Sequence, residues 1–286
     1  MKIKMLSFNC MYISAIFGQP MHNTYGNLAY VFALVGAPEI KQVPPHLAAI
    51  DLLKQTGSTI NTISMQSPNN IHGLRHALHI LNTKTITIKN DLVCNCRRSI
   101  YQIIFKDYRF GFSCHILNIW KMTRYDKLIY MDGDLAVMKN PDMMFRQWYM
   151  NNTTELRTPI ACNTKPRPDS YNTGVWGVTP SHKTFNELKK WLSEASYPCG
   201  IGSQTWVNLL FTMHSYSSAS ILWNMKADQG VTRCLHNTLN HNMQPYIVHW
   251  SGDRKPNTNI QTNDLYEKDA LQKYRNAVKN WTMFLE

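Results

Sequence analysis

Two aspartates one residue apart, Asp132 and Asp134, are the side chains of this sequence best suited to hold a metal ion. They follow residues 127–131, a short apolar run that predicts a buried strand. Side chains alternate along an extended segment, so both carboxylates point the same way, and Gly133 between them lets a ligand approach the backbone. A hard divalent cation needs such oxygen ligands and can bridge phosphates. The alternative is a plain Asp-Gly turn between two strands.

Another polar segment, residues 249–256, could complete such a site. A neutral imidazole such as that of His249 can join the ligand set of Mn2+, which accepts nitrogen as well as oxygen. Gly252 allows backbone amides to face a phosphate, and Lys255 supplies a point charge to it. The alternative interpretation is a core histidine followed by a surface turn.

Alternating strand-like and helix-like runs must position these residues. The sequence predicts helices over residues 47–55, 116–125, 181–192 and 203–211, a peripheral helix over 265–284, and strands over 60–65, 127–131, 135–138, 172–178 and 246–250. Residues 29–35 fit a buried strand or a helix. This alternation predicts an α/β fold with a mainly parallel sheet. Ligands bind beyond the carboxyl ends of strands in such sheets, and Asp132 and Asp134 fall at such an end.

Composition limits the classes of protein that fit. The chain has 286 residues, 44% hydrophobic and 17% charged, which is typical of a globular protein with one large domain or two small ones. The formal charge of +12 favours polyanionic partners such as nucleic acid, an anionic membrane or phosphorylated small molecules. The basic residues are scattered and form no polybasic arm, so we expect a solvated surface and no nucleic-acid partner.

The cysteines and the N-terminal residues bear on the compartment. The seven cysteines match no zinc pattern, because Cys94 and Cys96 are too close for the usual ligand pair, and buried free thiols in a reducing compartment are expected. No run of about 18 apolar residues exists, so no membrane span is expected. Lys2 and Lys4 precede the fairly apolar residues 5–17, which fit either a first core strand or a weak signal peptide. The cytoplasm is the expected compartment, with secretion as the alternative.

Four segments, in combination and order, resemble the glycogenin-type retaining glycosyltransferases, the family that includes galactinol synthases. Residues 125–145 (YDKLIYMDGDLAVMKNPDMMF) resemble the family's strand, DxD motif and following turn, and residues 169–181 (DSYNTGVWGVTPS) resemble its sugar-binding strand. Residues 203–211 (SQTWVNLLF) resemble its Asp-Gln helix, and residues 248–256 (VHWSGDRKP) resemble its closing motif. Four motifs in the correct order are specific, and the likeness spans roughly residues 105–256.

The resemblance implies a nucleotide-diphosphosugar transferase (GT-A) fold, a single α/β domain with a mixed, mainly parallel central sheet. The domain would span residues 1–260, with a divergent nucleotide-binding half over 1–100, and a C-terminal helical tail would follow over 261–286. The assembly could be a homodimer.

The resemblance also implies a site and a reaction. Asp132, Asp134 and His249 would hold Mn2+ or another divalent cation. A hexose would move from a UDP-sugar to an unknown glycan, protein or small polyol with retention of configuration, and Asp169 and Gln204 would act in catalysis. The implied substrate-binding residues are Gly133, Asp169, Asn172, Thr173, Gly174, Ser203, Gln204, Gly252 and Lys255.

One departure from the family opens an alternative. The family has an aspartate where this chain has Ser203, which can hydrogen-bond but cannot carry charge. An active glycosyltransferase is the first hypothesis, and a catalytically impaired binder of sugar nucleotides or glycans is the second. A basic nucleic-acid-binding protein is the third, although the sequence contains no known motif for it. No base-binding residue can be assigned in the N-terminal third.

Overall fold

A computed structural model describes residues 26–35, 40–68, 71–88, 96–97, 113–159, 171–194, 197–198, 207, 214–227, 243–250, 255–256, 258 and 260–286. The predicted site residues Asp169, Ser203, Gln204 and Gly252 lie outside these ranges, as does most of the predicted helix over 203–211.

The centre of the fold is a seven-stranded sheet. Its strands are β1 (Leu28–Leu34), β2 (Asn61–Gln66), β3 (Thr83–Thr87), β5 (Lys127–Met131), β7 (Glu155–Pro159), β8 (Tyr171–Val178) and β10 (Tyr216–Ser218). The order across the sheet is β10-β7-β8-β5-β1-β2-β3. Strand β8 runs antiparallel to its neighbours β5 and β7, and the other pairs are parallel. The predicted α/β fold with a mixed, mainly parallel sheet is therefore confirmed.

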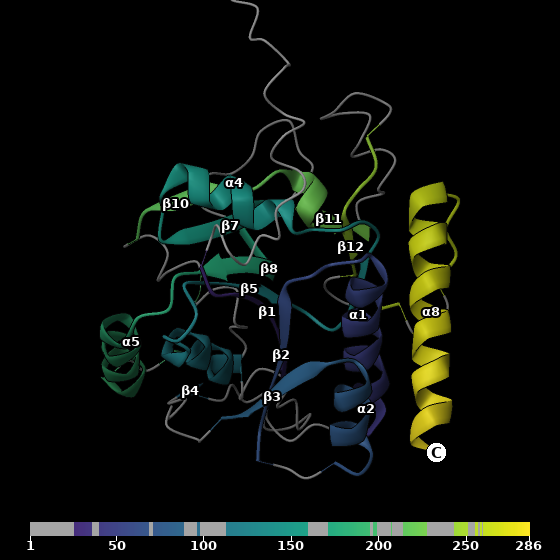
Figure 1. Cartoon of the computed structure of the whole chain (residues 1–286), viewed down its shortest axis with the longest axis horizontal. Helices are drawn as coiled ribbons and strands as arrows, with labels where there is room; N and C mark the ends of the chain where they lie inside the picture. The colour runs from purple at the N-terminus through teal and green to yellow at the C-terminus, as the bar shows by residue number, and fades with distance from the viewer. Residues whose placement is uncertain are drawn as a thin grey trace, which may run out of the picture.

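Helices cover both faces of this sheet. They are α1 (Val43–Gln55), α2 (Leu74–Ile80), α4 (Met143–Asn151), α5 (His182–Glu194) and α8 (Leu265–Leu285), with 3-10 helices η3 (Ile40–Gln42), η4 (Ser113–Lys121) and η5 (Ile221–Trp223). Figure 1 shows α1, α2 and α8 on one side of the sheet and α5 on the other.

Strand β1 divides the hydrophobic core in two. Tyr30 and Phe32 pack with α1 and α8, whereas Ala29 and Val31 pack on the opposite face with η4 and α5. A strand buried on both faces is apolar at every position, so its sequence lacks the two-residue alternation that distinguishes a strand from a helix. Periodicity left residues 29–35 undecided for this reason, and the structure makes them a strand.

Two smaller sheets complete the architecture. The three-stranded sheet has the order β11-β12-β6, formed by β11 (Met225–Lys226), β12 (Ile247–His249) and β6 (Leu135–Val137). Strands β4 (Cys96–Arg97) and β9 (Tyr197–Pro198) form a two-stranded sheet. The three-stranded sheet matters for function because β6 begins directly after Asp134 and β12 ends at His249.

The structure corrects three expectations from the sequence. The C-terminal helix α8 is not peripheral, since Leu271, Tyr274 and Trp281 are buried in the larger core. Helix α1 begins at Val43 and includes the Pro-Pro pair in its first turn, where the missing N–H groups have no intrahelical partner to lose. Cys114 is disulfide-bonded, so the expectation of free thiols is wrong for this residue.

Among the described residues, no helix is both long and apolar enough to cross a bilayer.

Candidate metal centre

The pairing of two short strands brings the candidate ligands together. Strand β5 ends at Met131, and the amide of Asp132 still donates to the carbonyl of Gly174 on β8 at 2.8 Å. Strand β6 then pairs antiparallel with β12, so that Leu135 lies opposite His249. Because Asp134 immediately precedes Leu135, this register places its carboxylate beside the imidazole.

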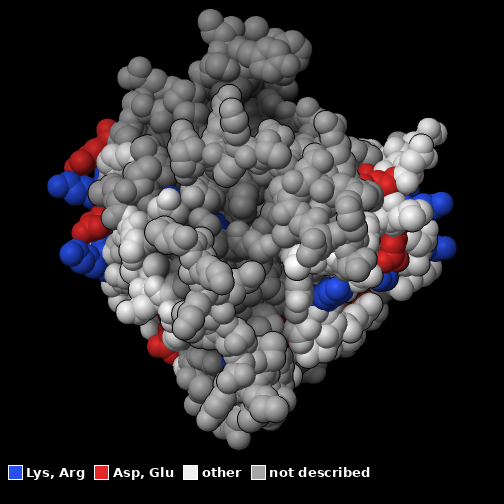
Figure 2. All heavy atoms as spheres, turned by 90° about the horizontal axis from the view of Figure 1, so that it is seen from above, with Lys and Arg blue, Asp and Glu red and all other residues white. Residues whose placement is uncertain are grey.

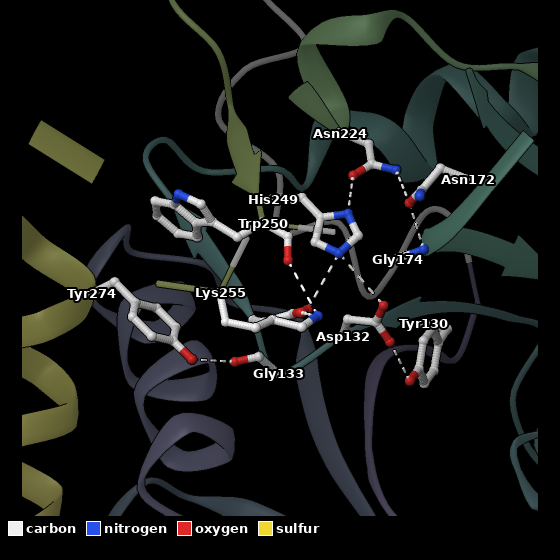
Figure 3. Close-up of polar contacts among 11 residues, drawn as sticks. Tyr130, Asp132, Gly133, Asn172, Gly174, Asn224, His249, Trp250, Lys255 and Tyr274 are labelled. Carbon is white, nitrogen blue, oxygen red and sulfur yellow. Dashed lines mark hydrogen bonds and ion pairs between the residues drawn. The ribbon is translucent and has the colours of Figure 1, made fainter. Parts of the chain in front are cut away.

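Asp132, Asp134 and His249 form one cluster. One donor atom from each lies within 4.8 Å of the others, and within the described ranges this is the one group of three or more metal-ligating side chains found. The His249 Nε2 atom is 3.6 Å from Asp132 Oδ2 (Figure 3) and 3.3 Å from Asp134 Oδ1. Two carboxylates and one imidazole fit a divalent cation that accepts both oxygen and nitrogen, such as Mn2+.

Two asparagines orient His249 toward the carboxylates. The Nδ1 atom of His249 lies 3.1 Å from Asn224 Oδ1, and Asn224 Nδ2 donates to Asn172 Oδ1 at 2.8 Å. The amide of Gly174 donates to the same Asn172 oxygen at 2.7 Å. Because the Asn224 oxygen can only accept, Nδ1 carries a proton, and with a cation bound Nε2 would offer its lone pair to that cation, as in many metal sites.

Tyr130 holds the other side of the cluster. Its hydroxyl donates to Asp132 Oδ1 at 2.7 Å, which leaves Oδ2 facing His249 (Figure 3). Loss of surrounding water and the negative charge of Asp134 raise the pKa of Asp132 to about 6. The same loss of water opposes ionisation of Asp134, but His249 and Lys255 outweigh it and lower the pKa of Asp134 to about 2. Two crowded carboxylates repel one another, and a bound cation would relieve that repulsion.

Lys255 places a positive charge beside the cluster. Its ammonium forms an ion pair with Asp134 and lies 3.4 Å from the carbonyl oxygen of Trp250. The amide of Trp250 donates to the carbonyl of Asp134 at 3.1 Å, which ties the segment after β12 to the aspartate pair. Lys255 therefore lies beside Asp134, and its predicted contact with a phosphate stays a prediction.

An open pocket of about 490 Å³ adjoins the cluster. Gly133, Asp134 and Lys255 line one part of it, and Lys41 and Gln42 line another. A volume of this order suits a small-molecule ligand. The pocket lies at the carboxyl ends of β1 and β5, where open α/β sheets bind ligands.

Three predicted substrate residues lie on β8 close to the cluster. Asn172 and Thr173 are buried, and the Asn172 side chain supports His249 through Asn224. Gly174 packs so closely on the His249 ring that a Cβ atom would overlap it. The predicted contacts of these residues with a sugar stay predictions.

Three residues around the cluster were not identified from the sequence. Tyr130 lies two positions before Asp132 on an extended segment, so strand alternation alone could have assigned it to the same face. Asn224 and Tyr274 gave no such local signal. Asn224 reaches His249 from across the small sheet, and Tyr274 donates to the carbonyl of Gly133 from α8.

Known proteins resemble both the sequence and the fold, although no protein-family profile matches. Over 160 residues the chain is 28% identical to glycogenin-1 of Oryctolagus cuniculus, covering 56% of this chain and 44% of that protein. Over 166 residues it is 25% identical to UDP-glucuronate:xylan alpha-glucuronosyltransferase 1 of Arabidopsis thaliana, covering 58% of this chain and 22% of that protein. The chain therefore spans less than half the length of these two relatives.

A solved structure extends the likeness over most of the chain. The galactosyltransferase LgtC in complex with donor and acceptor sugar analogs superposes with a TM-score of 0.55, covering 88% of this chain and 95% of that one. The sequence identity is 12%, so this match concerns the fold alone. The fold and the cluster define a GT-A glycosyltransferase scaffold. Within that class, the chain is similar in sequence to glycogenin-1, at 28% identity over 56% of its length.

Proposed function

We propose that this chain is a Mn2+-dependent glycosyltransferase that moves a hexose from a UDP-sugar to an acceptor with retention of configuration. The observation that carries the proposal is the convergence of Asp132, Asp134 and His249 beside a pocket that Asp134 lines, in a GT-A fold. A structural cluster without a ligand would have no need for two adjacent, partly buried carboxylates facing an oriented imidazole, because crowding such charges costs free energy.

The pocket supports a nucleotide-diphosphate donor. Lys41 and Lys255 supply positive charge at its walls, and Asp134 is the cluster residue that lines it. The name of the Arabidopsis relative specifies a UDP-linked donor for that protein. In this chain, a diphosphate would contact the metal cluster and Lys255 from the pocket side, with the nucleoside toward Lys41 and Gln42.

The residues of the chain divide the chemical work. The bond from the anomeric carbon to the diphosphate oxygen breaks, a bond from that carbon to the acceptor hydroxyl oxygen forms, and the hydroxyl proton passes to the departing diphosphate. The bound metal would supply Lewis-acid stabilisation of the departing diphosphate. Lys255 would add a fixed positive charge on the same side. Preorganised charges of this kind usually make the largest contribution to lowering the activation free energy. Tyr130 and Asn224 keep Asp132 and His249 in place.

Several finer assignments belong to the proposal. Asp169, Ser203 and Gln204 would face the sugar, and the Gly252 amide would face a phosphate. The acceptor and the homodimer also remain proposals. The expectation of a cytoplasmic location is weakened in favour of secretion by the disulfide at Cys114, because disulfides form and persist mainly in oxidising compartments.

Ser203 favours a second candidate, a sugar-nucleotide or glycan binder that keeps the metal site without turnover. A nucleic-acid-binding protein has less support. On the face shown in Figure 2, the described lysine and arginine side chains lie beside acidic ones along two margins and form no continuous basic patch. Nucleic-acid binding driven by phosphate contacts would need such a basic patch.

The test is release of UDP from a panel of UDP-sugars in the presence of Mn2+, comparing the wild type with Asp134→Ala. We expect the variant to lose at least about a hundredfold in release, since Asp134 is both a metal ligand and the partner of Lys255. Asp269→Ala is the matched control, because Asp269 is exposed on α8 and pairs only locally with Lys273.

The outcomes separate the candidates. Release that depends on Mn2+ and on Asp134 supports the enzyme. UDP-sugar binding without release supports the binder. No UDP binding, together with salt-dependent binding of DNA, would overturn both.

A further inference from the structure

Helix α8 reaches the turn between Asp132 and Asp134 from outside the four sequence motifs that resemble those of the family. Figure 1 shows it running alongside α1 at the edge of the molecule. Ala270, Leu271, Tyr274, Ala277 and Trp281 form its buried face. Besides packing in the core, Tyr274 also forms a hydrogen bond to the turn between the two aspartates.

The Tyr274 hydroxyl donates to the carbonyl oxygen of Gly133 at 2.7 Å (Figure 3). Gly133 is the residue between the two aspartates, so this bond fixes the peptide plane in the middle of the ligand pair. Burial, with a further contribution from the charge of Asp134, raises the pKa of Tyr274 far above its ordinary value. The hydroxyl therefore stays protonated at any working pH and always acts as a donor.

Tyr274 and neighbouring residues of α8 also contact the segment that carries His249 and Lys255. The ring of Tyr274 packs against Trp250, with 5.6 Å between the ring centroids, and Trp250 directly follows His249. The Trp250 indole donates to Glu267 on α8 at 3.3 Å. Arg275 donates to the carbonyl of Pro256 at 3.0 Å and to that of Thr258, next to Lys255. One rigid helix thus contacts both segments that carry the ligands.

We propose that Tyr274 is a positioning residue of the metal site, which holds the Gly133 carbonyl so that Asp132 and Asp134 keep the separation that a divalent cation requires. A turn containing glycine has many accessible backbone conformations, and a hydrogen bond from a fixed helix selects one of them. The inference rests on the metal site of the proposed function, but it does not require that the transfer reaction occurs.

The test is a direct titration of the full-length protein with Mn2+, following free Mn2+ by electron paramagnetic resonance, for the wild type and Tyr274→Phe. We expect the variant to bind Mn2+ about tenfold more weakly, which is typical for loss of a group that supports a metal ligand. The ring remains, so its packing against Trp250 is kept and the circular dichroism spectrum should not change.

The matched control is Trp281→Phe on the same helix. The Trp281 indole donates to Asp51 of α1 at 3.0 Å, so this variant also removes one hydrogen bond between α8 and the body of the protein. We expect a lower melting temperature and wild-type Mn2+ affinity.

Three results would overturn the inference: Mn2+ affinity within twofold of the wild type for Tyr274→Phe, an equal loss for Trp281→Phe, or no Mn2+ binding by the wild type. If the wild type binds Mn2+ but releases UDP from no donor, the proposed transfer fails while the titration still decides the role of Tyr274.

Discussion

His249 depends on Asn224, a residue that is fully buried and bonded on both sides of its amide. Its oxygen faces the imidazole and its nitrogen faces Asn172. An asparagine in this place can both accept from His249 and donate to Asn172, which no aliphatic side chain of similar size can do. The tautomer of the candidate ligand is therefore set by a residue that would not itself touch the metal.

The first prediction concerns this contact. Asn224→Ala should weaken Mn2+ binding by about ten- to a hundredfold, because His249 loses the partner that fixes its proton on Nδ1. Asn224→Asp should recover part of the affinity, since a carboxylate still accepts from Nδ1. Calorimetric titration of both variants with Mn2+ measures the effect, and equal affinities for the wild type and Asn224→Ala would contradict it.

At the scale of elements, strand β8 brings two glycines against two different parts of the molecule. Gly174 lies against the His249 ring, and a Cβ there would also stand 2.8 Å from Asn172 Oδ1. At Gly177, a Cβ would stand 2.6 Å from the ring of Trp148 and 2.9 Å from Leu156. One strand therefore contacts both the candidate ligand and the core.

The second prediction uses this pair of glycines as its own control. Gly174→Ala should reduce Mn2+ affinity by more than about tenfold, because the new methyl group displaces His249. Gly177→Ala should lower the free energy of unfolding by about 1–3 kcal/mol through overpacking, while Mn2+ affinity stays near that of the wild type. Urea unfolding and metal titration of both variants separate the effects. A loss of affinity for Gly177→Ala as large as that for Gly174→Ala would show that the strand acts only through stability.

At the scale of the whole molecule, the larger core buries a titratable side chain. His46 is 2% exposed, and its Nε2 atom lies 2.8 Å from the hydroxyl of Ser64. Burial lowers the pKa of His46 to about 4. In the unfolded chain a histidine has its ordinary pKa of about 6.5. Between about pH 6.5 and about pH 4, the imidazole is therefore protonated in the unfolded state and neutral in the folded state.

The third prediction follows from that difference. Stability contributed by neutral His46 is complete above about pH 6.5 and is lost as the pH falls toward 4. Between about pH 7.5 and about pH 5.5, the wild type should lose about 1 kcal/mol more of its free energy of unfolding than His46→Gln does. Urea unfolding of both proteins at the two pH values isolates His46, because all other titratable groups are shared. Parallel pH profiles would rule out the effect.

The sequence was most informative where structure is local. The strand expected over residues 127–131 is confirmed at both ends, and the strand expected over 172–178 is confirmed with one more residue, as 171–178. Hydrophobic runs and side-chain alternation act over a few residues, so they can be read without knowledge of the fold. The expected helix over 116–125 is a 3-10 helix over 113–121, a difference that apolar spacing alone cannot resolve.

The sequence by itself indicated the candidate ligands: Asp132 and Asp134 through their place after a strand, and His249 through the resemblance of residues 248–256 to the closing motif of the family. The tertiary structure alone decided how they meet. The register that places Leu135 opposite His249, the link through Asn224, and the bond from Tyr274 to Gly133 across 141 residues depend on which elements pack together. Packing sums weak contacts over the whole chain, so a single segment cannot specify it, and a helix expected at the periphery lies against the centre of the site.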